Sequence, residues 1–359
     1  MEDEPRVIGL VADPGIAQAL AQKSRAKLEE ALNRQASGQH WSIAVDPFSL
    51  PLGESGQVML SAHAEKLKRK FGWQHIIYLT DVPHYHDGRP VSTLVDPELG
   101  IATVVIPSLG IALPRNTTKV LLEVIEELAG SRTGPASDLA RSLGVLQRKQ
   151  TGSGAEQVDS VEGLGGRIIL IVGMIRSNRP WKLVPRLSSA LAGAAATGAF
   201  GVFYTSIWSM ADYLSPLRLS LITLAGVLIL STWLLFHNRL WEKPRGSYRK
   251  ERMVLYNLAT VLTVSLAALA MYLLLFLALL VGGLVVIDQE YLSMQLDHEV
   301  GFGEYLNLAW LAASLGIMGG AIGSSFDDVE AVQRATFSQR EYERRTMEFE
   351  VQEEETSGE

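Results

Sequence analysis

The feature that most constrains this chain is a block of apolar sequence from Leu187 to Phe326, which one basic and one acidic insert divide into pieces. The hydrocarbon core of a bilayer is about 30 Å thick, so a helix needs roughly 20 apolar residues to cross it. The block contains four segments of suitable length, and we expect each to be a transmembrane helix. They are residues 187–210, 217–237, 253–287 and 305–326.

The segment 253–287 is the longest, and as one helix with a rise of about 1.5 Å per residue it would extend roughly 50 Å. It could cross the membrane once, with tilt or an interfacial extension, or form a hairpin that crosses twice. Because Lys and Arg are enriched in cytoplasmic loops, the charges on either side favour one crossing. The preceding insert is basic (Arg239, Lys243, Arg245, Arg249, Lys250, Arg252), and the following loop is acidic (Asp288, Glu290, Asp297, Glu299).

The residues before the apolar block indicate a domain that is not exported. The sequence starts Met1, Glu2, Asp3, Glu4, without the basic start and apolar core of a secretory signal. With four crossings, both termini lie in the cytoplasm, and we expect the protein in the plasma (inner) membrane. The chain has no cysteine, which excludes disulfides and thiolate metal sites. The basic residues gather beside the membrane segments, so they indicate the lipid bilayer as a partner and no nucleic acid.

Residues 1–130 alternate short apolar runs with amphipathic stretches, which is typical of an α/β domain. The fold class is therefore an α/β N-terminal cytosolic domain plus an all-α membrane domain of four transmembrane helices. The pattern predicts strands at 6–12, 42–45, 75–79 and 101–106 and helices at 16–35, 58–71 and 117–128.

Two other regions complete the predicted domain organisation. We expect residues 131–186 to be a linker and a membrane-surface segment. The composition of residues 130–166 shifts towards Ser and Gly, which predicts a linker with at most one short helix at 137–147. Within residues 131–186, the apolar run 168–175 could be a strand or a helix. Residues 327–359 form a charged cytosolic tail, and we expect it to be helical to about Val351, to fray beyond it, and to dock on the α/β domain or on a protein partner.

Asp13, Asp46 and Asp81 each end or follow a predicted strand, and each lies close to a proline. In open α/β sheets, ligands bind beyond the carboxyl ends of the strands, so these three carboxylates could line one crevice. They are the candidate catalytic residues if the domain is an enzyme. The alternative is that they only end strands and cap helices, as Asp and Pro commonly do.

His84 and His86 are the candidate metal ligands, because in an extended strand their side chains point to the same face. A solvated turn is the alternative, since Gly88 and Pro90 follow and no third ligand has a recognisable spacing. We therefore expect no metal and no cofactor. The chain also lacks a phosphate-binding loop, a dinucleotide fingerprint and a nucleophile elbow, so nucleotide hydrolysis, dinucleotide redox chemistry and serine hydrolysis have no support.

Small residues recur along the first and last apolar segments. Such spacing lets helix backbones approach closely, which is how helices associate in lipid. The two segments could pack on each other within one chain, or join two copies in a homo-oligomer. The residues are Ser189, Gly193, Thr197 and Gly201 in the first segment and Gly316, Gly319, Gly320 and Gly323 in the last.

The order of elements in residues 75–130, together with Glu127 and Leu128, resembles archaemetzincin-type zinc proteases. In that family the helix carries His-Glu-Leu-Gly-His, whose histidines bind zinc while the Glu activates water. Glu126 and Gly130 stand at the two histidine positions of this chain. The resemblance therefore implies an archaemetzincin-like scaffold that lacks the zinc-binding histidines.

The approach to the first apolar segment, Asn-Arg-Pro-Trp at 178–181, resembles uncharacterised multi-pass membrane proteins of actinobacteria, and this resemblance implies no activity. We expect an integral membrane protein whose cytosolic α/β domain acts as a binding, sensing or scaffold module and is not catalytic. The alternatives are a membrane-surface enzyme that uses the strand-end carboxylates, or a transport component. The segments have no charged residue deep inside them, which argues against ion-coupled transport.

Overall fold

The computed structural model describes residues 6–35, 40–53, 57–86, 89–110, 114–130, 146–150, 157–161, 163–242 and 250–346. The chain forms two compact units. The first consists of Met1–Ser177 together with Phe337–Glu359, and the second is Asn178–Thr336. The chain therefore leaves the first unit after Ser177 and returns to it at Phe337.

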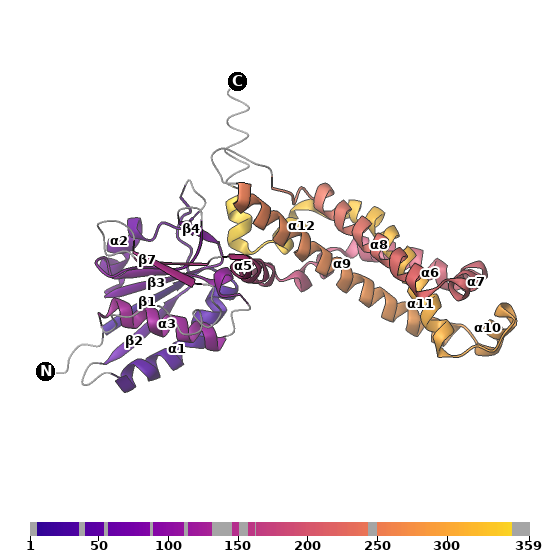
Figure 1. Cartoon of the computed structure of the whole chain (residues 1–359), viewed down its shortest axis with the longest axis horizontal. Coiled ribbons are helices and arrows are strands. Elements are labelled where there is room, and N and C mark those ends of the chain that lie inside the picture. Colours follow the sequence, from indigo (N-terminus) through magenta and orange to yellow (C-terminus); the bar gives the residue numbers. More distant parts are fainter. Residues whose placement is uncertain are drawn as a thin grey trace, which may run out of the picture. The chain divides into compact units, whose positions relative to one another are not determined.

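A sheet of eight strands forms the centre of the first unit (Figure 1). Its strands are β1 (Arg6–Ala12), β2 (Trp41–Asp46), β3 (His75–Thr80), β4 (His84–His86), β5 (Arg89–Asp96), β6 (Ile101–Val105), β7 (Leu146–Gln150) and β8 (Gln157–Val161). They lie in the order β2-β1-β3-β6-β5-β8-β7, and β4 pairs with β5. The β2-β1-β3-β6 part is parallel, and the pairings beyond β6 are antiparallel.

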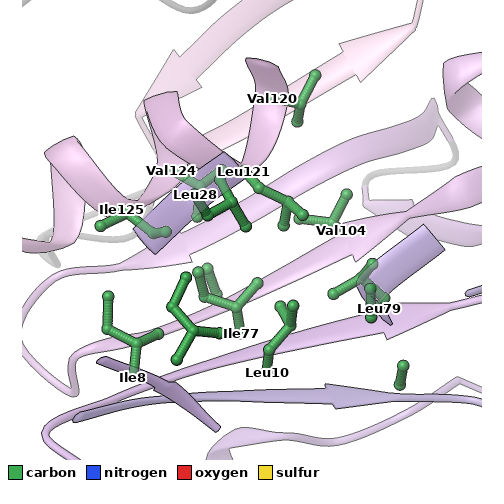
Figure 2. Close-up of a cluster of buried hydrophobic side chains, with 14 of the residues drawn as sticks. Ile8, Leu10, Leu28, Ile77, Leu79, Val104, Val120, Leu121, Val124 and Ile125 are labelled. Atoms are coloured by element: carbon green, nitrogen blue, oxygen red, sulfur yellow. The ribbon is translucent and has the colours of Figure 1, made fainter. Parts of the chain in front are cut away.

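Helices cover both faces of the sheet. On one face, α1 (Ile16–Gln35) and α3 (Pro114–Leu128) pack on the side chains that β1, β3 and β6 direct towards them. Figure 2 shows this core, with Leu121 and Ile125 of α3 close to Ile77 of β3. On the other face, α2 (Ser61–Phe71) packs on a second cluster that includes Tyr78. The α/β class predicted for the N-terminal region is confirmed.

The segment predicted as a linker and membrane-surface segment contains regular structure at residues 146–150 and 157–178. β8 joins the sheet beside β5, and its buried Asp159 accepts a hydrogen bond of 2.7 Å from Thr93. The apolar run 168–175 is helical and belongs to α5 (Gly163–Asn178). A Cβ on Gly173 would overlap with the carbonyl of Pro107, so glycine allows this close packing. Most of the helix expected at 137–147 lies outside the described residues.

The second unit is helical. Its longer helices are α6 (Ser188–Phe203), α7 (Thr205–Tyr213), α8 (Pro216–His237), α9 (Lys250–Val286), α10 (Gln289–Leu296), α11 (Phe302–Gly323) and α12 (Val329–Thr336). α8, α9 and α11 are each long and apolar enough to cross a membrane, and α6 with α7 would make a fourth passage if the bent pair is one span. α9 is a single helix of 37 residues, so a hairpin over 253–287 does not form.

The first expected span, 187–210, is not one helix. α6 and α7 are bent by 85° at Tyr204, whose backbone is extended. Neither proline nor glycine stands at the break, but Trp208 Nε1 donates a hydrogen bond of 2.8 Å to the carbonyl of Val202. This bond satisfies a carbonyl in the last turn of α6, which lacks a partner further along the helix.

The two stripes of small residues face each other within the second unit. A Cβ on Gly319 of α11 would overlap with the side chain of Thr197 of α6, and one on Gly323 would overlap with the carbonyl of Ser189. A Cβ on Gly193 would lie 3.1 Å from the carbonyl oxygen of Gly319. The close approach of the two backbones therefore depends on these glycines. A homo-oligomer through the same residues would have to separate α6 from α11.

Candidate functional site

The candidate site lies at the carboxyl edge of the parallel strands in the first unit. β1 lies between β2 and β3, with Val11 opposite Asp46 and Ala12 opposite Leu79. α1, which follows β1, and α2, which follows β2, cover opposite faces of the sheet. The connections therefore diverge at β1 and β3, and such a switch point is where open α/β sheets bind ligands.

Asp13 and Asp81 meet at this switch point. The Asp13 side chain is fully buried, and its Oδ2 accepts a hydrogen bond of 3.2 Å from the backbone N–H of Asp81. Tyr78 of β3 donates its hydroxyl to Asp13 Oδ1 at 2.5 Å. Asp46 is half-buried at the end of β2, and it is not among the groups that contact Asp13. Two of the three predicted aspartates are thus linked, through the Asp13 carboxylate and the backbone of Asp81, and the third lies on the next strand.

A guanidinium from the far end of the chain completes the site. Arg340 Nε lies 2.9 Å from Asp13 Oδ1, and the side chains are 3% and 0% exposed. Arg340 Nη2 donates to the carbonyl of Leu50 at 2.5 Å, while the Leu50 N–H donates to Tyr78 Oη at 3.1 Å. Asp13, Tyr78, Leu50 and Arg340 therefore form a closed polar ring, which we call the Asp13–Arg340 cluster.

The electrostatics of the Asp13–Arg340 cluster follow from its burial. Burial raises the pKa of Asp13 above its ordinary value of 3.8, although Arg340 and the hydrogen bond from Tyr78 act to lower it. Burial and the Asp13 carboxylate raise the pKa of Tyr78 far above its usual range, so the phenol keeps its proton and remains a donor. Burial disfavours the Arg340 charge, but Asp13, Tyr78 and Glu343 together outweigh this effect, and the pKa of Arg340 is raised.

Arg340 belongs to a helix that covers residues 339–346. Glu341 of this helix is buried and accepts two hydrogen bonds from Arg344, at 3.0 and 2.6 Å, and one from Arg345 at 3.1 Å. Burial alone would raise the pKa of Glu341, but the two arginines outweigh it and hold this pKa below 4.5. The expected docking of the tail on the α/β domain is confirmed for this helix, while residues 347–359 lie outside the described part of the chain.

The candidate metal ligands His84 and His86 lie on β4 as expected. His84 is buried, and its ring nitrogens lie 3.0 Å from the Val82 carbonyl oxygen and 3.3 Å from that of Val58. Both nitrogens therefore face backbone acceptors, whereas a metal ligand needs a free lone pair. No group of three potential metal ligands occurs among the described residues. Glu126 and Glu127, which carry the archaemetzincin resemblance, lie at the end of α3.

The sequence did not indicate Tyr78, Leu50 or Arg340 as site residues. Tyr78 reads as one more apolar residue of a buried strand, and Leu50 contributes only backbone groups. Arg340 is one of several charged residues in an amphipathic tail. No family model, curated protein or solved structure matches the chain. Its function must therefore be inferred from the residues themselves.

Proposed function

We propose that this chain is an integral protein of the plasma (inner) membrane whose α/β unit is a cytoplasmic binding or sensing module. In this proposal the second unit anchors the module, and the chain crosses the membrane four times. The observation that carries the proposal is the ion pair between Asp13 and Arg340, which joins residues from before and after the apolar helices in one compact unit.

The exposed apolar faces of the helices support a lipid environment. Only 33% of the apolar stretch of α8 and 22% of that of α9 are buried within the chain. Leu221, Leu224 and Leu228 of α8 are more than half exposed, at 56%, 55% and 54%. Contiguous apolar surfaces of this size are unusual in water, and lipid tails would cover them without any further protein.

The ion pair also constrains how often the chain crosses. Asp13 precedes the second unit and Arg340 follows it, so the number of crossings between them must be even. α8, α9 and α11 alone would give three passages, which is an odd number. The bent pair α6–α7 supplies the fourth passage. Since α6 has 16 residues, about 24 Å at 1.5 Å per residue, it fits a thinned or indented part of the bilayer.

The charge distribution supports the same orientation. With four passages, the basic insert between α8 and α9 lies on the same side as the α/β unit, and the acidic loop between α9 and α11 lies on the other side. Loops rich in Lys and Arg remain in the cytoplasm, so the α/β unit is cytoplasmic.

The state of Asp13 supports a binding role over a catalytic one. Its carboxylate is fully buried and already contacts Tyr78, the Asp81 N–H and Arg340. A general base or a nucleophile must reach its substrate, which this carboxylate does not do while Arg340 is in place. Buried polar groups that hold a guanidinium are, in contrast, the contacts of a binding site.

The absence of cysteine allows a clean test of the topology. Lys27→Cys, Gln295→Cys and Gln339→Cys each place one thiol at an exposed position, and the cysteine-free parent measures the background. A membrane-impermeant maleimide should label Gln295→Cys in intact cells, and it should label the other two variants only after permeabilisation. Labelling of Lys27→Cys and Gln339→Cys from opposite sides would refute the proposal.

A further inference from the structure

We infer that the carboxyl edge of the sheet in the α/β unit is a guanidinium-binding site, and that Arg340 occupies it as an internal ligand which an arginine side chain of a partner peptide can replace. This inference rests on the proposed binding function and names its ligand class. The partner is recognised through one guanidinium group.

The α/β unit offers a guanidinium two acceptors in fixed positions. One is the carboxylate of Asp13, which Tyr78 and the Asp81 N–H hold in place, and the other is the carbonyl of Leu50. They lie beside different nitrogens of Arg340: Asp13 Oδ1 forms an ion pair with Nε at 2.9 Å, and the Leu50 carbonyl accepts a hydrogen bond of 2.5 Å from Nη2. A planar guanidinium reaches both acceptors at once, whereas an ammonium group presents its donors from a single atom.

The present occupant belongs to a segment that is distant from the sheet in sequence. Arg340 is remote in sequence from Asp13 and returns to the unit on the helix of residues 339–346. Its third nitrogen, Nη1, donates at 2.6 Å to Glu343 of the same helix. The helix therefore brings part of the guanidinium coordination with it, and the sheet supplies the remainder. A partner helix with arginine and glutamate three residues apart would present the same arrangement.

The cost of leaving buried polar groups without a partner explains why a second guanidinium must replace Arg340. When the helix leaves, Asp13 and the Leu50 carbonyl lose the partner that compensates their burial. Replacement of a buried ion pair by apolar side chains is often neutral or stabilising, so apolar packing would hold the helix on the sheet at least as well as the ion pair does. The advantage of the ion pair is selectivity, because only a group with matching donors can satisfy Asp13 and the Leu50 carbonyl again.

The first test is chemical rescue of Arg340→Ala in the full chain in detergent. Methylguanidinium at ten times its dissociation constant should slow hydrogen exchange at the Leu50 and Asp81 amides about tenfold. Methylammonium at the same concentration should not. The double variant Asp13→Asn/Arg340→Ala is the matched control and should not respond to methylguanidinium. Equal effects of the two cations, or an equal response of the double variant, would overturn the inference.

The second test separates a peptide arginine from a free guanidinium compound. A labelled peptide of residues 337–346 should bind Arg340→Ala at least about tenfold more tightly than the same peptide with Lys at position 340, since a hydrogen bond to a charged group contributes about 1.5–3 kcal/mol. Rescue by methylguanidinium without this difference would show a free ligand and overturn the peptide partner.

A third variant covers the case in which Arg340→Ala does not fold. Arg340→Lys keeps a cation beside Asp13. The arginine peptide should displace the 339–346 helix of this variant from the sheet, and the lysine peptide should not. Failure of both peptides would contradict the inference. None of these results depends on which side of the membrane the unit occupies, so cysteine labelling still tests the proposed function separately.

Discussion

Replacement of Arg340 by alanine should release the C-terminal helix from the sheet. The variant removes the ion pair to Asp13, whose two side chains are 3% and 0% exposed, and the hydrogen bond to the Leu50 carbonyl. Removal of one partner of a buried ion pair destabilises by about 3–5 kcal/mol, because the remaining charge is buried without compensation. At 1.36 kcal/mol per factor of ten, protection of the helix against exchange should fall by a factor of roughly 200 to 5,000.

Hydrogen–deuterium exchange of the full chain in detergent measures this effect at the amides of the 339–346 helix and at Leu50. The matched control is Arg334→Ala on α12, which removes an exposed ion pair with Glu330 whose side chains are 60% and 56% exposed. Exposed pairs of this type contribute about 0–1 kcal/mol, so the control should change exchange by less than about fivefold.

A second variant separates charge from packing. Asp13→Asn/Arg340→Met removes both charges and keeps most of the side-chain volume, so it should recover the larger part of the lost protection. Exchange that stays within twofold of the parent in Arg340→Ala would refute the reasoning, because it would show that the ion pair does not hold the helix.

Three further predictions concern other contacts. Tyr78→Phe removes the donor to Asp13 and the acceptor of the buried Leu50 N–H, and it should lower the free energy of unfolding by about 1–3 kcal/mol in a denaturant titration; an unchanged midpoint would contradict the cluster. Gly319→Ala places a Cβ against Thr197 and should cost about 1–3 kcal/mol, seen as a lower thermal midpoint in detergent, whereas Gly282→Ala, which meets nothing within 4 Å, should not lower the midpoint. Because the folded pKa of Glu341 lies below 4.5, the contribution of its carboxylate to folded-state stability is complete above pH 4.5 and is lost as the pH falls through the lowered pKa. Hydrogen exchange of the 339–346 helix, corrected for the intrinsic rate, should therefore become faster as the pH falls through this range, and Glu341→Gln should abolish this pH dependence.

The strands and helices that sequence patterns predicted are those with a strong local signal. β1, β3 and β6 are nearly continuous apolar runs, as buried parallel strands are. β5 and β8 were missed because each mixes polar and apolar residues. The polar ones, such as Ser92 and Asp159, are accommodated by hydrogen bonds between the two strands. Such compensation arises only after the strands pair, so periodicity does not reveal it.

The candidate site shows the same division between local and long-range information. The proline-flanked aspartates marked the carboxyl edge, and two of them, Asp13 and Asp81, do meet there. Arg340, the ion-pair partner of Asp13, comes from the other end of the chain, and no spacing within the sequence relates the two residues. The break at Tyr204 was likewise missed, because the apolar run has no proline and no glycine stands at the break, so it reads as one helix.

The most direct test of the central claim is a distance measurement between the sheet and the C-terminal helix. Spin labels at Lys27→Cys and Gln339→Cys, both exposed positions in a chain without native cysteine, report this distance by dipolar electron paramagnetic resonance. Docking through Asp13 and Arg340 predicts one narrow distance distribution that broadens when Arg340→Ala is added. A distribution in the parent chain that is already broad, and that Arg340→Ala leaves unchanged, would contradict the claim.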